Sequence, residues 1–418
     1  MSPADRCAAA VRRWARAAAA GGAPPPFPFR QSTALVRAHG TNALRGAVPA
    51  ALHDAAAAAR GQDRVDWFTR TWLDALAARV TGAATYAHYV LTPVLDRHCR
   101  CGAGPDHQVD AARLAAALTA DLVHHELRPD AAAHPRRVRA AVRLAADLHA
   151  ALRPGGPHPG GGRAARRAPT AAADPRAARR TCRRLLSALA GGQGPLLRQL
   201  LAWTPLPATG APDEYLFMRA VQVMEVLAWA AAAQARAAGT HRADIGEVTG
   251  RLAALAGNLR RATDLFPLLS TLDPAQFATV RAGTYGTGAL QSPGFAALER
   301  HCRGVPALRP ETVGAVGVDR CPVPHPALGE TLRALRARLD PGAAARLAAH
   351  VDAVDDAWLR WKRAHCGVTR RLIGAVPGTG HTDGLAYLRR HAAAGLLAGD
   401  PPAVAGERGR TVAPAWTT

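Results

Sequence analysis

The sequence has almost no lysine. Lys362 is the single one, so arginine supplies the rest of the 53 basic residues. Alanine, glycine and proline are abundant, a composition typical of GC-rich coding bias. The formal net charge of +22 would suit nucleic acid or an anionic membrane. However, the arginines are spread over predicted helix faces and are not gathered in a stripe with aromatic side chains. We therefore expect no nucleic-acid binding.

Long apolar runs and regularly spaced cysteines are also lacking. No stretch approaches the length of a membrane span, and Arg12, Arg13 and Arg16 interrupt the only Ala-rich segment near the N-terminus. The seven cysteines are odd in number and irregularly spaced, which argues against a secreted disulfide framework. We expect a cytoplasmic protein that does not associate with a membrane.

Strand patterns are scarce, because β-branched and aromatic residues rarely alternate with polar ones. Alanine is the best helix former, so the sequence predicts an all-α fold. Residues 63–80 are one example of apolar side chains at helical spacing. We predict an N-terminal helical region of unknown role (1–152), a flexible Gly/Pro/Arg linker (153–178), a helical domain that carries the chemistry (179–400) and a tail (401–418).

Two segments of the second half place apolar and basic side chains at suggestive positions. Phe217, Val221 and Met224 share one face of a predicted helix, either as core or as the wall of a ligand pocket. Arg281 stands before a Gly/Thr loop that ends at Gln291-Ser292, where its planar guanidinium suits a carboxylate. The alternative for Arg281 is an ordinary surface arginine.

Two further segments follow near the C-terminus. Trp358, Trp361 and His365 lie on one apolar helical stripe with Val368 and Leu372. Such a histidine is either a satisfied core residue or a single axial heme ligand. The loop over 378–384 has three glycines and two threonines whose backbone N–H groups and hydroxyls suit a ligand. It lacks the spacing of a nucleotide-binding loop.

The order of these four blocks resembles the tryptophan 2,3-dioxygenase family. Trp361 and His365 match the family's W-x-x-x-H, Arg371 through Gly374 match its R-x-I-G, and Gly378-Thr379-Gly380 match its GTG loop. The block ending Gln291-Ser292 matches S-G-F-Q-S without a gap back to Arg281. The resemblance covers residues 185–391, about half of the chain. It implies a helical heme domain, heme b as cofactor and a homo-oligomer, either a dimer or a tetramer.

The resemblance also implies a role for individual residues in binding the cofactor. His365 would be the proximal ligand of the heme iron. Trp361, Gly378 and Gly380 would lie beside the cofactor. No metal ligand other than His365 is implied.

For the substrate, the resemblance implies tryptophan or a related indole or aromatic amino acid, together with O₂. Arg281 would bind the substrate carboxylate, and Thr379 would hold the amino group and a heme propionate. Phe217 would lie against the indole. Val221 would occupy the distal position, so no certain catalytic residue is implied.

The departures from the family concern the substrate. Val221 stands where the family has a distal histidine, and the paired tyrosines that close a neighbouring site are missing around 194–203. His381 and Asp383 replace small residues of the loop. The first 150 residues have no counterpart in the family. These differences indicate a divergent member, with a role in secondary metabolism in place of catabolism.

Three other functions remain open. One is a heme-dependent mono-oxygenase acting on a tyrosine-like phenol, and another is a heme protein that senses or stores. The third is a non-catalytic helical protein that binds a metal or a partner. Its best feature is His98-Cys99-Arg100-Cys101 with His107, although these lack the paired CxxC spacing of zinc sites.

Overall fold

The computed structural model consists of helices joined by loops. It describes residues 1–21, 23–101, 107–128, 134–152, 174–240, 244–284, 288–304, 326–378 and 382–397. Every regular element in these ranges is a helix and none is a strand, so the predicted all-α fold class is confirmed.

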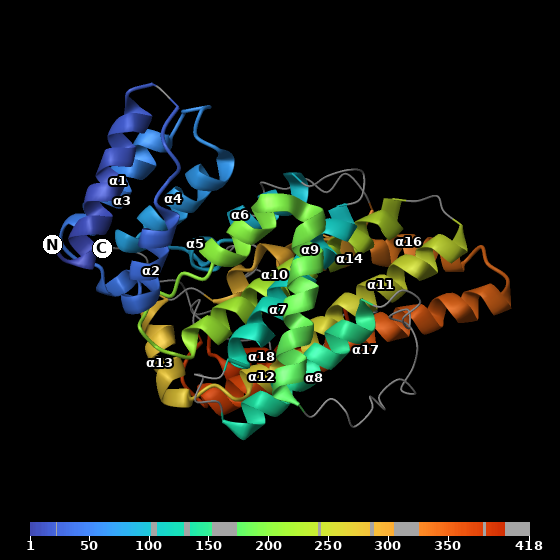
Figure 1. The fold of residues 1–418 in the computed structure, drawn as a ribbon. Coiled ribbons are helices and arrows are strands. Elements are labelled where there is room, and N and C mark those ends of the chain that lie inside the picture. Colours follow the sequence, from blue (N-terminus) through green and yellow to red (C-terminus); the bar gives the residue numbers. More distant parts are fainter. Residues whose placement is uncertain are drawn as a thin grey trace, which may run out of the picture.

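The N-terminal helices form a lobe at one end of the molecule, drawn in blue in Figure 1. Its first helix starts with a capping box between Ser2 and Asp5. Small alanine side chains let α1 and α3 pack closely, and Phe27 contacts both Trp14 and Trp72 in the interior. The lobe comprises α1 (Pro3–Ala19), α2 (Phe29–His39), the 3-10 helix η1 (Thr41–Ala43), α3 (Ala47–Ala59) and α4 (Trp67–Val80).

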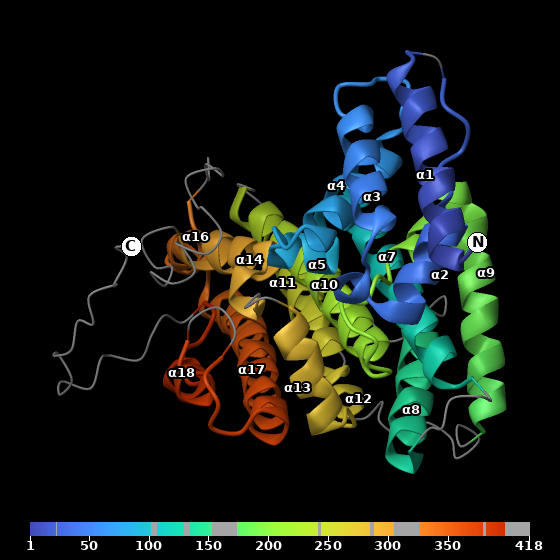
Figure 2. The ribbon, with the colours of Figure 1, turned by 90° about the vertical axis from the view of Figure 1, so that its left-hand side faces the viewer.

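Four helices follow and run from the lobe into the larger body of the protein. The longest of them, α7, packs against α9 and α10 (Figures 1 and 2). Its buried side is mostly leucine and alanine, and it also buries the polar side chains of Thr119 and Glu126. The four are α5 (Tyr86–Val90), α6 (Thr92–Cys101), α7 (His107–Glu126) and α8 (Pro135–Ala151).

The second half of the chain forms the rest of the body. Figure 2 shows α9 along one side, and α17 and α18 on the other. These helices are α9 (Pro175–Trp203), α10 (Glu214–Thr240), α11 (Ile245–Thr263), α12 (Phe266–Leu269), α13 (Pro274–Gly283), the 3-10 helix η4 (Ala289–Gln291), α14 (Pro293–Arg303), α16 (Leu328–Arg336), α17 (Pro341–Leu372) and α18 (Leu385–His391).

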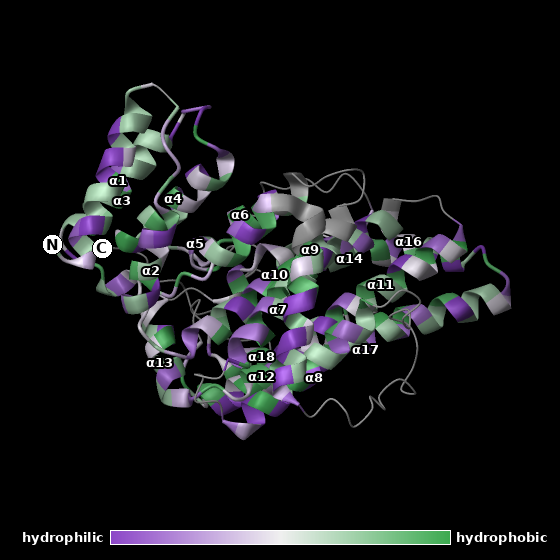
Figure 3. Cartoon of the chain, viewed as in Figure 1, coloured by the Kyte–Doolittle hydropathy of each residue, from purple (hydrophilic) through white to green (hydrophobic). Residues whose placement is uncertain are grey.

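The helix α10 is the central element of the body. It packs against α7, α11 and α14, and its side chains are mostly buried. Within the described chain it is also the one helix long and apolar enough to pass for a membrane span, and most of that apolar stretch lies inside the fold. Figure 3 shows hydrophobic and hydrophilic residues alternating around most other helices, as expected where one side of a helix packs and the other faces solvent.

Helices from both sides of the predicted linker share one hydrophobic cluster, which extends from Cys7 to Leu372. The indole of Trp72 also donates a 2.7 Å hydrogen bond to the carbonyl of Trp203. Residues 153–173 of the linker and the whole predicted tail (401–418) lie outside the described residues, and the rest of the linker enters α9. The boundary between the two predicted domains therefore stays a prediction.

Individual helices agree with the sequence pattern to within a few residues. The helix expected over 63–80 begins at Trp67, because Asp66 caps its N-terminus by accepting from the backbone N–H of Thr69. Phe68 and Trp72 of this helix are buried as their spacing predicts.

Candidate functional site

A large, mostly apolar cavity lies between α10, α12, α13, α14, α17 and α18. It holds about 1760 Å³ of space free of protein atoms, with the solvent at its mouth included. Ligand-binding clefts are typically concave and apolar, with a few polar groups at fixed positions. Six predicted site residues line this one cavity: Phe217, Val221, Arg281, Trp361, His365 and Gly378. Residues that are up to 161 positions apart in the chain are thus brought together.

The stripe predicted on the C-terminal helix faces the cavity. Trp358, Trp361, His365, Val368 and Leu372 all line it, and all lie on α17. The helix is continuous from Asp340, its N-cap, so the stripe has a rigid support. The imidazole of His365 lies 5.3 Å from the Trp361 ring and 6.0 Å from the Phe266 ring, centroid to centroid.

His365 is neutral at physiological pH. Although it borders the cavity, surrounding protein withdraws it from bulk water, and this desolvation lowers its pKa to about 4. Among the described residues it has no hydrogen-bond partner and no nearby carboxylate that would favour the charged form. A neutral imidazole with free nitrogens is the form that ligates a metal.

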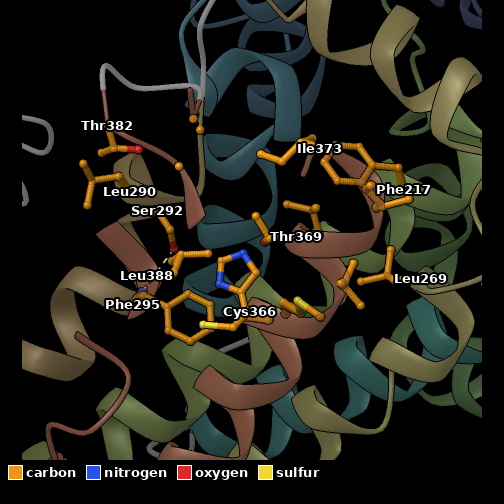
Figure 4. A pocket seen from close by; sticks show the side chains of 18 of the residues that line it. Phe217, Leu269, Leu290, Ser292, Phe295, Cys366, Thr369, Ile373, Thr382 and Leu388 are labelled. Atoms are coloured by element: carbon orange, nitrogen blue, oxygen red, sulfur yellow. Dashed lines mark hydrogen bonds between the residues drawn. The ribbon is translucent and has the colours of Figure 1, made fainter. Parts of the chain in front are cut away.

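The neighbouring Cys366 also lines the cavity, where Figure 4 shows it close to Thr369. Burial raises the pKa of its thiol, so it is protonated at neutral pH. Since the thiolate is the metal-binding form of cysteine, His365 is the better ligand of the two.

An indole N–H on the same wall has no partner. The Trp361 Nε1 atom is buried and makes no hydrogen bond to any described residue. Its ring packs between Trp358, at a 7° interplanar angle, and Phe295, at 4.5 Å between centroids. A buried donor without an acceptor costs free energy unless a ligand supplies one.

Arg281 lies in the last turn of α13 at the edge of the cavity. Its guanidinium donates a 2.5 Å hydrogen bond to the carbonyl of Pro377 and makes no ion pair with any described carboxylate. This bond joins the last turn of α13 to Pro377, just before the loop that starts at Gly378. The remaining N–H groups of Arg281 are available to a ligand carboxylate, as the sequence suggests.

The two ends of the glycine loop (378–384) that the structure describes are joined by a hydrogen bond. The Gly378 N–H donates to the carbonyl of Thr382 at 2.8 Å, and Gly384 has a positive φ of 63°. A Cβ on Gly384 would lie 2.6 Å from the carbonyl oxygen of Val376, so the glycine is required there. The predicted ligand residues Thr379 and Gly380 lie outside the described residues, as does His381.

The α10 side of the cavity is apolar. Phe217, Val221 and Met224 all line it, so the face that the sequence left open as core or pocket wall borders the cavity. Figure 4 shows Phe217 and Leu269 on one side of the pocket, opposite Leu290 and Ser292 on the other. With Val221 there, this wall offers no imidazole to a ligand.

Two tyrosines that the sequence analysis did not identify also line the cavity. Tyr86 and Tyr89 lie on α5, in the predicted N-terminal region (1–152). Each phenol donates a 3.1 Å hydrogen bond to a buried carboxylate of α10, Tyr86 to Glu225 and Tyr89 to Glu214. The N-terminal region therefore completes the pocket of its own chain.

The two carboxylates have different surroundings. Glu214 accepts four hydrogen bonds, from Tyr89, from the backbone of Ala208 and from the backbone and hydroxyl of Thr209. From the described residues Glu225 accepts three hydrogen bonds, and burial raises its pKa to about 7. A carboxylate has about four acceptor positions, so Glu214 is saturated and Glu225 is not.

The zinc alternative gains no support from the described residues, which hold no group of three or more His, Cys, Asp or Glu side chains in position for a metal. Cys99 is buried, whereas the side chains of His98, Arg100, Cys101 and His107 lie outside the described part of the chain.

Comparison with known proteins adds no relative: no family model and no curated protein matches this chain.

Proposed function

We propose that this protein is a heme-dependent oxygenase that acts on tryptophan or a related indole or aromatic amino acid. The observation that carries the proposal is the position of His365, a neutral, unpartnered imidazole in the wall of a large apolar cavity. Arg281 and Phe217 border the same cavity, so a cation for a carboxylate and a ring for an aromatic ligand are both present.

The residues around the cavity fit heme. A porphyrin supplies four ligands to its iron and needs only one or two from the protein, which a single histidine provides. The aromatic and aliphatic stripe of α17 suits the face of a planar macrocycle. The unpartnered Nε1 donor of Trp361 suits a polar substituent of such a cofactor. His365 would be the proximal ligand, with Trp361 and Gly378 beside the cofactor.

The chemistry supplied by a bound heme would be activation of O₂. The chain's own residues would bind and orient the organic substrate, which accelerates a reaction by proximity. Arg281 would hold the carboxylate, and Phe217 and Val221 would enclose the ring and exclude water. Val221 cannot act as a base, so this wall does not select one reaction. Cleavage of an indole ring is the proposed reaction, and mono-oxygenation of a tyrosine-like phenol is the alternative.

The visible spectrum of the purified protein tests the proposal. We expect a Soret band in the wild-type protein and its loss, or loss of bound heme, in His365→Ala. Cys366→Ala is the matched control, because it alters the adjacent cavity residue and leaves the imidazole in place. A histidine-ligated spectrum that survives in His365→Ala would falsify the assignment of the ligand.

A further inference from the structure

The phenol of Tyr86 donates its proton to a hydrogen bond within the protein. Its phenol donates to Glu225 Oε2 at 3.1 Å, and the same oxygen accepts the Ser292 hydroxyl at 2.6 Å. The Ser292 oxygen in turn accepts a hydrogen bond from the backbone N–H of Phe295, and Ser292 is thereby the N-cap of α14. With its proton turned to Glu225, the phenolic oxygen of Tyr86 has only lone pairs to offer to anything else.

The carboxylate that holds this phenol is itself fixed by the backbone. Glu225 Oε1 accepts the Gly294 N–H at 2.6 Å, and a backbone N–H cannot turn round to accept. A Cβ on Gly294 would lie 2.8 Å from that oxygen, so the contact requires glycine. Above its pKa, which burial raises to about 7, Glu225 is an ionised carboxylate and both of its oxygens face donors, so Tyr86 is held as an acceptor.

The pair formed by Tyr86 and Glu225 lies beside the ligand pocket. Glu225 follows Val221 by four residues and so lies one turn along the same face of α10. Tyr86 and Ser292 line the cavity together with Val221, and Figure 4 shows Ser292 beside Leu290 at its edge. A hydrogen-bond acceptor thus stands close to an otherwise apolar wall of the pocket.

We propose that Tyr86 determines ligand specificity on the α10 side of the pocket, because its oxygen accepts a hydrogen bond from the ring N–H of an indole while Glu225 holds its own proton away. This inference rests on the proposed function, since it names the ligand group that the proposed pocket selects. Tyr89 does not share the role, because its partner Glu214 lies at the far end of the Phe217–Val221 face.

Calorimetric titration of the full chain with L-tryptophan and with 1-methyl-L-tryptophan, at a pH above the Glu225 pKa of about 7, tests the inference. One net hydrogen bond changes a dissociation constant by roughly two- to tenfold, so we expect wild type to prefer tryptophan by about that factor. Tyr86→Phe should bring the ratio of the two dissociation constants to about one. Tyr89→Phe is the matched control, since it removes the equivalent bond from the same helix, and should keep the wild-type ratio.

Glu225→Gln tests the positioning role in a protein that keeps the phenol. The amide oxygen must face the Gly294 N–H, which leaves the amide NH₂ to face Tyr86 and Ser292. Tyr86 would then accept from the amide and turn its proton toward the ligand, so the preference for tryptophan should disappear here too. If the substitution only disturbed the packing of the core, it would weaken the binding of both ligands alike.

Several results would overturn the inference. They are a wild-type ratio that persists in Tyr86→Phe, an equal loss in Tyr89→Phe, or a wild-type protein that binds the two ligands equally or binds neither. These outcomes are distinguishable from failure of the proposed function, because binding is measured independently of the Soret band. A protein without heme that still shows the Tyr86-dependent preference would contradict only the oxygenase proposal.

Discussion

Asp121 of α7 and Arg219 of α10 form a 2.8 Å ion pair in which the arginine is fully buried. The phenol of Tyr215 donates to the same carboxylate at 2.7 Å, and its ring stacks on His125 with 3.6 Å between centroids. Arg219 also donates to Thr204 and Gln222 beside it. This network ties the N-terminal region to the helix that carries the pocket wall.

The first prediction concerns the stability of this connection. Asp121→Asn should lower the free energy of unfolding by about 3–5 kcal/mol, because it leaves the Arg219 charge buried without a counter-charge. Chemical denaturation followed by circular dichroism measures the difference. Asp74→Asn is the control, since Asp74 pairs with Arg60 at 3.2 Å on the surface, where such pairs contribute about 1 kcal/mol or less. A loss no larger than that of the control would contradict the structural role.

The second prediction concerns the pH dependence that His365 imposes on the heme-free protein. Its pKa is about 4 in the fold and near 6.5 when unfolded, so the unfolded chain binds the proton more readily between these values. Stability should therefore fall as the pH drops from 6.5 to 4, by up to about 3 kcal/mol from this group.

Comparison with His365→Leu isolates that contribution. Glu225, whose pKa is raised to about 7, has the opposite effect, because protonation favours its buried form as the pH falls. It is present in both proteins and cancels in the difference. Denaturation curves at several pH values should show wild type losing stability relative to the variant below pH 6.5. Parallel curves would mean that the imidazole is solvated like an ordinary surface histidine.

Local patterns predicted two walls of the pocket. The stripe on α17 and the face of α10 follow from the 3.6-residue period, because a helix places Trp361 and His365, or Phe217 and Val221, on one side wherever it packs. The pattern alone did not decide whether these faces border a cavity. That depends on how α10, α13 and α17 meet, which no single segment encodes.

The contribution of α5 was missed for a related reason. It has five residues, too few for a periodic signal, and its tyrosines function through carboxylates on α10 that are 125 and 139 positions away in the sequence. Nothing near Tyr86 indicates a ligand pocket. The available signal was a pair of tyrosines three residues apart and, on an apolar helix, two glutamates eleven residues apart. Only the tertiary structure shows that these four side chains form pairs.

The third prediction concerns Arg281 and separates two roles for it. If a substrate carboxylate pairs with its guanidinium inside the pocket, Arg281→Leu leaves that carboxylate unpaired and should cost about 3–5 kcal/mol of binding. The dissociation constant of tryptophan should then rise by roughly two to four decades, while that of plain indole, which has no carboxylate, should stay nearly constant. Optical or calorimetric titration of both ligands measures this. Arg360→Leu, which changes an exposed arginine on α17, is the control.

The competing role of Arg281 is structural, since its guanidinium bonds the carbonyl of Pro377 at the start of the glycine loop. Loss of that bond would loosen the loop whatever ligand is present, so tryptophan and indole would weaken together. Arg281→Lys sharpens the distinction: it keeps a charge that can bond one carbonyl but loses the planar fork that grips a carboxylate with two bonds. Under the carboxylate role, lysine should restore only part of the tryptophan affinity. Under the structural role, lysine should restore the affinity for both ligands equally. That result would exclude Arg281 as the carboxylate-binding residue.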